Sequence, residues 1–191
     1  MWNRYLRSCV WLIACLGAGR LYADEPPVWA TEAPLEVVSR LREPAADEVV
    51  VVVNANAVSL GNHAGLFAGS LLVDPAGSYV GRRSTDRRWP GPTLADYTRF
   101  QTSDGLEIRF YRFRLKPQAF ATIVQRIRDI GITPPLFCAS AVQNLLVGVP
   151  PFDGITRINW TSPKGLARVL DPLTQGERAV GECQTLAGAP C

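Results

Sequence analysis

Five consecutive valines, Val49 to Val53, constrain the fold of this 191-residue chain more than any other feature. They lie within a β-branched run from residue 48 to residue 58. A run that is apolar at nearly every position, rather than at every second one, is typical of a strand buried on both faces. We therefore expect residues 48–58 to form the central strand of a sheet.

Shorter strands are expected on the C-terminal side of this run. Residues 62–68 and 70–73 predict two strands joined around Gly69, and residues 74–77 predict a turn. Residues 106–115 predict another strand, although their imperfect alternation leaves open which face is buried. The sheet is therefore expected to be antiparallel.

The clearest helix is expected at residues 117–130, where the apolar side chains share one stripe, Pro117 suits the first turn and Gly131 follows the end. Further helices are expected at residues 34–41, 137–147 and 161–170. Residues 78–103 are rich in arginine, proline and glycine without a clear period, and predict a long surface loop with little structure of its own.

Strands and helices are segregated along the chain, which favours an α+β fold with an antiparallel sheet packed against a few helices. The length suits one domain, residues 24–191, after an export signal at residues 1–23. In that signal, a positive start precedes an apolar core too short to span a bilayer. We expect an exported, periplasmic protein. Alternatively, Leu12–Cys15 resembles a lipoprotein box, and lipidation of Cys15 would bring the chain to a membrane.

The charge balance changes once the signal is removed. The whole chain carries 20 basic and 17 acidic side chains, and three of the basic ones, Arg4, Arg7 and Arg20, lie in the signal. The remaining chain is formally neutral, so its charge gives no support for nucleic-acid binding. One histidine and scattered carboxylates offer no metal-ligand spacing, and no glycine-rich phosphate loop follows a strand. We therefore expect neither a metal nor a nucleotide cofactor.

Three cysteines remain beyond the signal, an odd number for an oxidising compartment. Cys183 and Cys191 flank a short segment flexible enough to close a local disulfide, which would leave Cys138 free. The alternatives are a buried, inert thiol at Cys138, or a disulfide between Cys138 and one tail cysteine. A free exported thiol is a liability unless it is used, so we favour a reactive Cys138.

Cys138 follows Pro134 and Pro135, which mark a boundary before the helix expected at residues 137–147. A thiol in the first turn of a helix lies near unpaired N–H groups. These groups lower the pKa of the thiol and can also bind the oxyanion of a tetrahedral intermediate. The same position also suits a small structural residue.

His63 is the only histidine, so any cysteine–histidine chemistry must use it. In a strand its side chain shares a face with Gly61, Gly65 and Phe67, and we expect the two glycines to leave open space around the imidazole for a substrate.

A third group must hold the imidazole tautomer. A hairpin about Gly69 would bring Asp74 close to His63, which makes Asp74 the natural candidate. Asp74 also suits a plain turn-initiating role before Pro75. Alternative partners for the imidazole are Asn54, Asn56 and Asn62.

These segments together resemble a known superfamily. Strand residues 63–67, a polar residue on the following strand and Cys138–Val142 at a helix start are similar to the circularly permuted papain-like thiol hydrolases of the NlpC type, a superfamily that includes the lecithin-retinol-acyltransferase-like enzymes. Histidine precedes cysteine here, which is the permuted order. The resemblance covers roughly residues 48–170. It implies a permuted papain-like fold with Cys138 as nucleophile, His63 as base and Asp74 as orienting residue.

We therefore expect an exported cysteine hydrolase that cleaves an amide or peptide bond, with cell-wall peptide (peptidoglycan) as a candidate substrate. One alternative is a lipid-directed thioesterase or acyltransferase that uses the same residues. Another is a non-enzymatic envelope binding protein on the same scaffold. The sequence predicts neither the scissile bond nor the oligomeric state.

Overall fold

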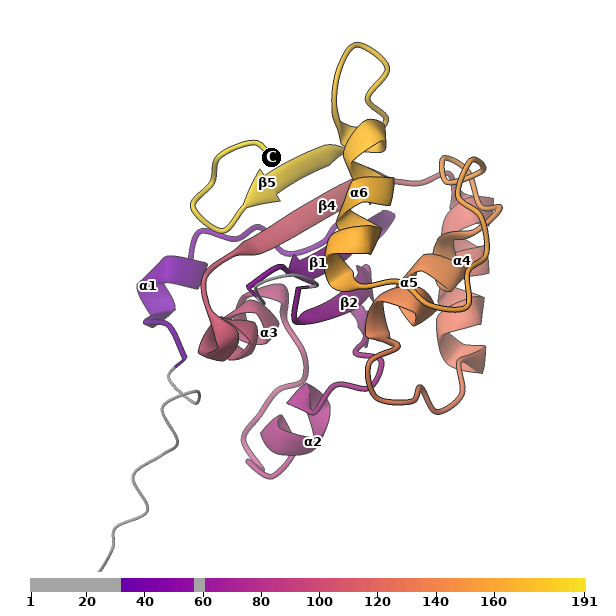
Figure 1. Ribbon diagram of the computed structural model, residues 1–191. Helices are drawn as coiled ribbons and strands as arrows, with labels where there is room; N and C mark the ends of the chain where they lie inside the picture. Colours follow the sequence, from indigo (N-terminus) through magenta and orange to yellow (C-terminus); the bar gives the residue numbers. More distant parts are fainter. Residues whose placement is uncertain (1–31, 57–60) are drawn as a thin grey trace, which may run out of the picture.

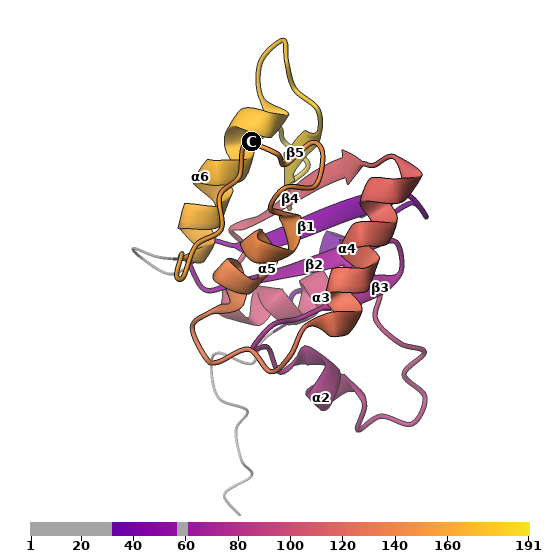
Figure 2. The same cartoon turned by 90° about the vertical axis from the view of Figure 1, so that its right-hand side faces the viewer.

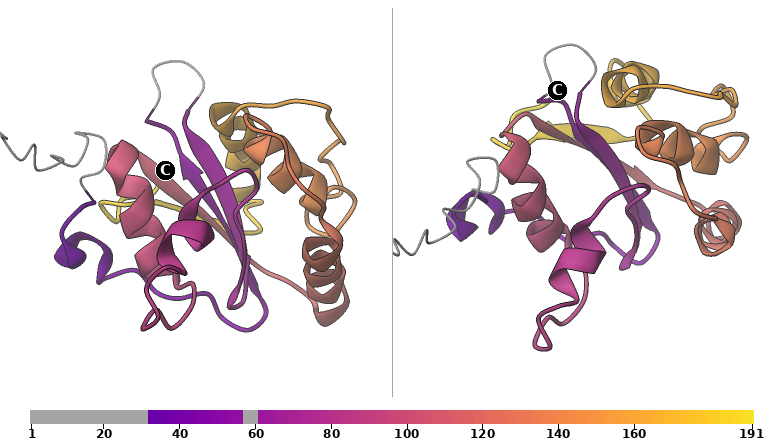
Figure 3. Two further views of the ribbon diagram at one scale, coloured as in Figure 1. Left: turned by 90° about the horizontal axis from the view of Figure 1, so that it is seen from below. Right: turned by 60° about the horizontal axis from the view of Figure 1, so that its bottom comes forward.

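A computed structural model of the chain describes residues 32–56 and 61–191. The expected signal at residues 1–23, the candidate lipidation site Cys15 and positions 57–58 of the expected central strand lie outside the described residues. The described residues form an α+β fold in which helices cover both faces of an antiparallel sheet (Figures 1 and 3). The predicted fold class is therefore confirmed, while the finer assignment to a permuted papain-like fold stays a prediction.

The sheet has five strands in the order β3-β2-β1-β4-β5, and all neighbours are antiparallel. The strands are β1 (Glu48–Asn54), β2 (His63–Ala68), β3 (Leu71–Val73), β4 (Ile108–Arg114) and β5 (Glu182–Thr185). The predicted central strand is confirmed, because β1 lies in the middle of the sheet and all its residues are buried. It ends at Asn54 and not at residue 58, since the Asn54 side chain accepts the N–H of Asn56 and starts a turn.

The helices form two layers. They are α1 (Leu35–Val38), α2 (Tyr79–Arg83), α3 (Leu94–Gln101), the 3₁₀ turn η2 (Thr102–Asp104), α4 (Pro117–Asp129), α5 (Cys138–Leu146) and α6 (Pro163–Thr174). Figure 2 looks onto the face covered by α4, α5 and α6, with α5 in the middle. The opposite face is covered by α2 and α3 (Figure 3).

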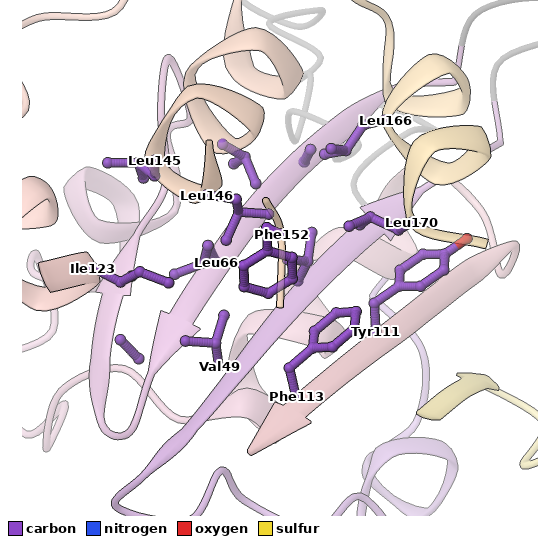
Figure 4. Packing of buried hydrophobic residues seen from close by; sticks show 14 of the residues in the cluster. Val49, Leu66, Tyr111, Phe113, Ile123, Leu145, Leu146, Phe152, Leu166 and Leu170 are labelled. Atoms are coloured by element: carbon purple, nitrogen blue, oxygen red, sulfur yellow. The ribbon is translucent and has the colours of Figure 1, made fainter. Parts of the chain in front are cut away.

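The alternation of side chains along β1 supplies both hydrophobic cores. Val49, Val51 and Val53 pack in the cluster below α4, α5 and α6, part of which is drawn in Figure 4. Val50 and Val52 pack in the second cluster with aromatic residues of α2 and α3. Successive side chains of a strand point to opposite faces, so an unbroken valine run requires these two layers.

The prediction of a loop with little structure over residues 78–103 is wrong, because this segment contains α2, α3 and most of η2. The Thr93 hydroxyl caps α3 by accepting the N–H of Asp96, and the carboxylate of Glu43, from a distant segment, accepts the N–H of Leu94 at 2.7 Å. On its buried side α3 carries the polar residues Thr98 and Gln101. These polar residues obscured the helical period of apolar residues in the sequence.

The C-terminal segment adds a strand that the sequence did not predict. β5 pairs with β4 at the edge of the sheet. It contains Cys183, which forms a disulfide with Cys191, so the predicted pairing of these two cysteines is confirmed. Cys138 is a free thiol. The alternative disulfide between Cys138 and the tail is therefore excluded.

A buried charge cluster explains the imperfect alternation of β4. Arg112 lies on the same face as Phe110 and is almost fully buried. Its Nη1 atom lies 3.2 Å from Oε2 of the buried Glu48, whose other carboxylate oxygen lies 2.7 Å from Nη2 of Arg42. Buried charges are tolerated only when they are paired and hydrogen-bonded, so β1 and β4 are joined by this cluster as well as by their backbones.

We expect Glu48→Ala to lower the free energy of unfolding by about 3 to 5 kcal/mol, because it leaves the Arg112 guanidinium buried and uncompensated. The measurement is urea unfolding followed by circular dichroism. As a matched control, Asp86→Ala removes the acid of the exposed Asp86–Arg88 pair and should change stability very little. Equal effects of the two substitutions would contradict a structural role for the buried cluster.

Candidate active site

The candidate site forms where the sheet is incomplete. β3 is only three residues long and pairs with Leu66–Ala68 of β2. The first half of β2, His63–Gly65, therefore has no β3 partner, although it remains paired with β1 on its other side. Asp74 follows the last residue of β3 and starts a turn, in which the N–H of Gly77 bonds to its carbonyl. This turn leaves the Asp74 carboxylate beside the unpaired half of β2.

His63 and Asp74 are in direct contact. The Nε2 atom of His63 lies 2.6 Å from Oδ1 of Asp74, and both side chains are largely buried, with 14% and 5% of their surfaces exposed. A carboxylate only accepts hydrogen bonds, so Nε2 carries the proton and Nδ1 is left for another partner. The expectation that the hairpin about Gly69 brings these two residues together is confirmed.

The alternative asparagine partners have other roles. The amide of Asn54 donates to the carbonyl of Gln101 at 3.0 Å, and its oxygen accepts the amide of Asn56 at 2.6 Å. The oxygen of Asn56 accepts the N–H of Glu107 at 2.8 Å. Asn62 is exposed. Asp74 is thus the candidate partner that contacts the imidazole.

Cys138 is the first residue of α5, so its predicted place in the first turn of a helix is confirmed, although the helix begins one residue later than expected. The preceding residue, Phe137, provides no side-chain cap for the helix, so the first-turn N–H groups have no capping side chain. Cys138 is only about 5% exposed, and His63 and the backbone N–H groups of Ala64 and Ala139 lie near enough to its sulfur to stabilise a thiolate. Ala64 lies in the unpaired half of β2, which frees its N–H for the sulfur.

The surroundings shift the pKa values of both groups in directions that suit an ion pair. Burial alone would raise the pKa of the Cys138 thiol, but the hydrogen bond and charge of His63, with the two backbone N–H groups, lower it. Burial alone would lower the pKa of His63, but its bonds to Asp74 and Cys138 raise it from 6.5 to about 9. His63 is therefore protonated at neutral pH, and the lowered pKa of Cys138 increases the fraction of its thiolate.

The two glycines near His63 do not leave the open space that we expected. A Cβ atom at Gly65 would overlap the hydroxyl of Tyr97, and one at Gly61 would lie 2.9 Å from Cβ of Pro163. The absence of side chains at Gly61 and Gly65 is therefore used for close packing against α3 and α6. The expectation of a substrate cleft at these glycines is wrong.

Sequence reasoning missed Tyr97, whose hydroxyl lies 3.0 Å from Oδ1 of Asp74. Tyr97 belongs to α3, within the segment that was expected to be a loop. Two signals were present: Thr93 three residues before Asp96 is an N-cap pattern, and Leu94 and Tyr97 have helical spacing.

An apolar rim adjoins the N-terminus of α5. We use this name for five large apolar side chains that are partly or fully exposed: Ile132, Leu136, Phe137, Ile158 and Trp160. The indole N–H of Trp160 donates to the carbonyl of Leu136 at 3.2 Å, which joins the two segments of the rim. Leu136 has a φ of +71°, a left-handed conformation that is uncommon for a residue with a side chain. Strained backbone of this kind often accompanies functional sites.

Other features of the described residues suggest no different chemistry. A pocket of about 570 Å³ lies away from Cys138, between the end of β4, the start of α4 and residues 148–151. Within residues 32–56 and 61–191, no group of three or more His, Cys, Asp or Glu side chains is arranged to hold a metal ion. None of the helices in the described part has the length and apolar character needed to cross a bilayer.

Comparison of the chain with protein-family models, with curated proteins and with solved structures found no match. The resemblance to permuted papain-like hydrolases therefore stays a prediction from the residues.

We expect iodoacetamide to alkylate Cys138 at pH 7 in a variant that lacks residues 1–23, because the lowered pKa increases the fraction of thiolate. In His63→Ala the reaction at pH 7 should slow by roughly ten-fold or more, since only the two backbone N–H groups then offset the effect of burial on the thiol pKa, and raising the pH should restore it. Mass spectrometry over time measures the rate. Cys183 and Cys191 are joined in a disulfide and do not react.

Asn62→Ala serves as the control for this experiment, because it removes an exposed polar side chain next to His63 and should leave the rate unchanged. A wild-type thiol that titrates at or above the ordinary value of 9.0 would contradict the ion pair.

Proposed function

We propose that this chain is a cysteine hydrolase in which Cys138 is the nucleophile, His63 the acid and base, and Asp74 the orienting residue. The observation that supports this proposal is the contact of one free thiol, at a helix N-terminus, with an imidazole that a carboxylate holds from the other side. Nucleophile, base and orienting group in hydrogen-bond contact are the arrangement that acyl-transfer chemistry needs.

The first half of the reaction forms a thioester. The thiolate of Cys138 attacks the carbonyl carbon of the substrate, and the carbonyl electron pair moves to its oxygen. Uncapped N–H groups in the first turn of α5 stabilise this oxyanion. The carbon–nitrogen bond then breaks as the imidazolium of His63 gives its proton to the leaving amine.

The second half releases the acyl group. Neutral His63 takes a proton from water, and the hydroxide attacks the thioester carbonyl. The acid leaves, and Cys138 and His63 return to thiolate and imidazolium. Asp74 stabilises the imidazolium through Nε2 in both halves.

We propose an amide or peptide bond in cell-wall peptide as the target, and an exported, periplasmic location. The disulfide between Cys183 and Cys191 supports an oxidising compartment, because such bonds are rare in reducing ones. The apparent export signal at residues 1–23 supports the same location.

The apolar rim favours a second candidate, a thioesterase or acyltransferase that acts on a lipid. Leu136 and Phe137 directly precede Cys138, and Trp160 bonds to Leu136, so exposed apolar side chains lie next to the candidate nucleophile. The catalytic residues would be the same, and the acyl chain would lie along the rim before its carbonyl reaches the sulfur.

We expect Cys138→Ala to abolish turnover of the substrate without loss of folding, because alanine is a close match for a buried thiol in volume. Hydrolysis of peptidoglycan fragments and of an acyl thioester or phospholipid should be measured by mass spectrometry, which also detects an acyl adduct on wild-type Cys138. An adduct from peptide supports the first candidate, and an adduct from lipid alone supports the second.

Equal turnover by wild type and Cys138→Ala would contradict both candidates. A wild-type thiol that forms no adduct and shows no raised reactivity would favour the remaining alternative, a non-enzymatic binding protein.

A further inference from the structure

We propose that Tyr97 is a positioning residue that holds the Asp74 carboxylate against His63 through a hydrogen bond from its hydroxyl. This inference rests on the proposed function, because it gives that site a fourth member. Tyr97 acts through Asp74 and not on the reacting atoms, so it is not a catalytic residue itself.

The Asp74 carboxylate is held by three donors. Its Oδ1 atom accepts the Nε2 proton of His63 at 2.6 Å and the hydroxyl proton of Tyr97 at 3.0 Å. Its Oδ2 atom accepts the backbone N–H of Tyr79 at 3.2 Å. Two of these donors come from α2 and α3, the layer opposite α5. The carboxylate is therefore fixed in both position and rotation.

Tyr97 is itself well fixed. Its side chain has no exposed surface, and its ring packs edge-to-face against Phe67 at 5.7 Å and Tyr79 at 5.1 Å between centroids. Gly65 leaves the space that the hydroxyl occupies. Burial, the nearby Asp74 charge and its hydrogen bond raise the pKa of Tyr97 well above its usual value, so the hydroxyl keeps its proton and donates.

The direction of these hydrogen bonds fixes the state of the imidazole. Tyr97 donates to Asp74, and Asp74 can only accept, so His63 must donate through Nε2 and present Nδ1 to Cys138. Without Tyr97, the backbone N–H of Tyr79 would be the one remaining donor, besides His63, that holds the Asp74 carboxylate. Asp74 follows a strand of only three residues, which restrains it little. The carboxylate could then rotate away, and both tautomers of neutral His63 would be populated.

The test compares Tyr97→Phe with a matched control, Tyr111→Phe. Tyr111 is also a fully buried tyrosine that donates to a carboxylate, Asp171 at 2.7 Å, but it packs in the other hydrophobic core. The chain has one histidine, so ¹⁵N spectra of protein without a histidine tag report the ring nitrogens of His63 unambiguously. Spectra are recorded well above the His63 pKa of about 9, where most of the rings are neutral.

We expect wild type and Tyr111→Phe to show a single tautomer with the proton on Nε2, and folded Tyr97→Phe to show a mixture. Alkylation of Cys138 at pH 7 should slow by roughly five- to ten-fold in Tyr97→Phe alone, the equivalent of one lost hydrogen bond. Wild-type tautomer and rate in folded Tyr97→Phe would overturn the proposal, as would equal changes in Tyr111→Phe.

If Tyr97→Phe does not fold, spectra of the wild-type protein still test the role of Tyr97. A cross-peak between the Nε2 proton of His63 and a tyrosine hydroxyl proton supports the proposal, and its absence counts against it. The spectra need no substrate, so they test the role of Tyr97 even if the wild-type protein hydrolyses nothing. Failure of the proposed function and failure of this inference are therefore distinguishable.

Discussion

The early end of β3 is the constraint on which the candidate site depends. β3 stops at Val73, so the N–H of Ala64 on β2 is not used in a strand ladder and can bond to the sulfur of Cys138. The chain also turns immediately after Val73, which keeps Asp74 beside β2. A β3 strand two residues longer would pair with Gly65 and Ala64, and it would occupy the N–H of Ala64.

Both helical layers contribute residues to the site. The geometry of the site therefore depends on how both layers pack on the sheet. Cys138 comes from α5 on one face, whereas the donors that hold Asp74 come from α2 and α3 on the other. The two layers are placed relative to each other by β1, whose valines pack into both cores. A substitution that leaves a cavity in either core is therefore expected to displace the site residues slightly, because packed interiors transmit strain.

The sequence predicted those parts of the structure that follow from strong local patterns. Val49–Val53 predicted the central strand, Pro134 and Pro135 predicted the start of α5, and the spacing about Gly69 placed Asp74 near His63. What it could not predict depends on partners from distant segments. α3 buries polar residues and is capped in part by Glu43, and Gly65 is filled by Tyr97. These are tertiary contacts, which no local period reveals.

The charged groups of the site determine one another's pKa values. Burial alone would neutralise both Cys138 and His63, and it is the dominant single influence on each pKa. Each group is nevertheless shifted toward its charged form, because the other one lies beside it and Asp74 lies behind the imidazole. The shift of both groups toward their charged forms is thus a property of the assembled group of three. This mutual dependence explains why a histidine and a cysteine 75 positions apart carry a functional signal only when the hairpin, α5 and α3 meet at one edge of the sheet.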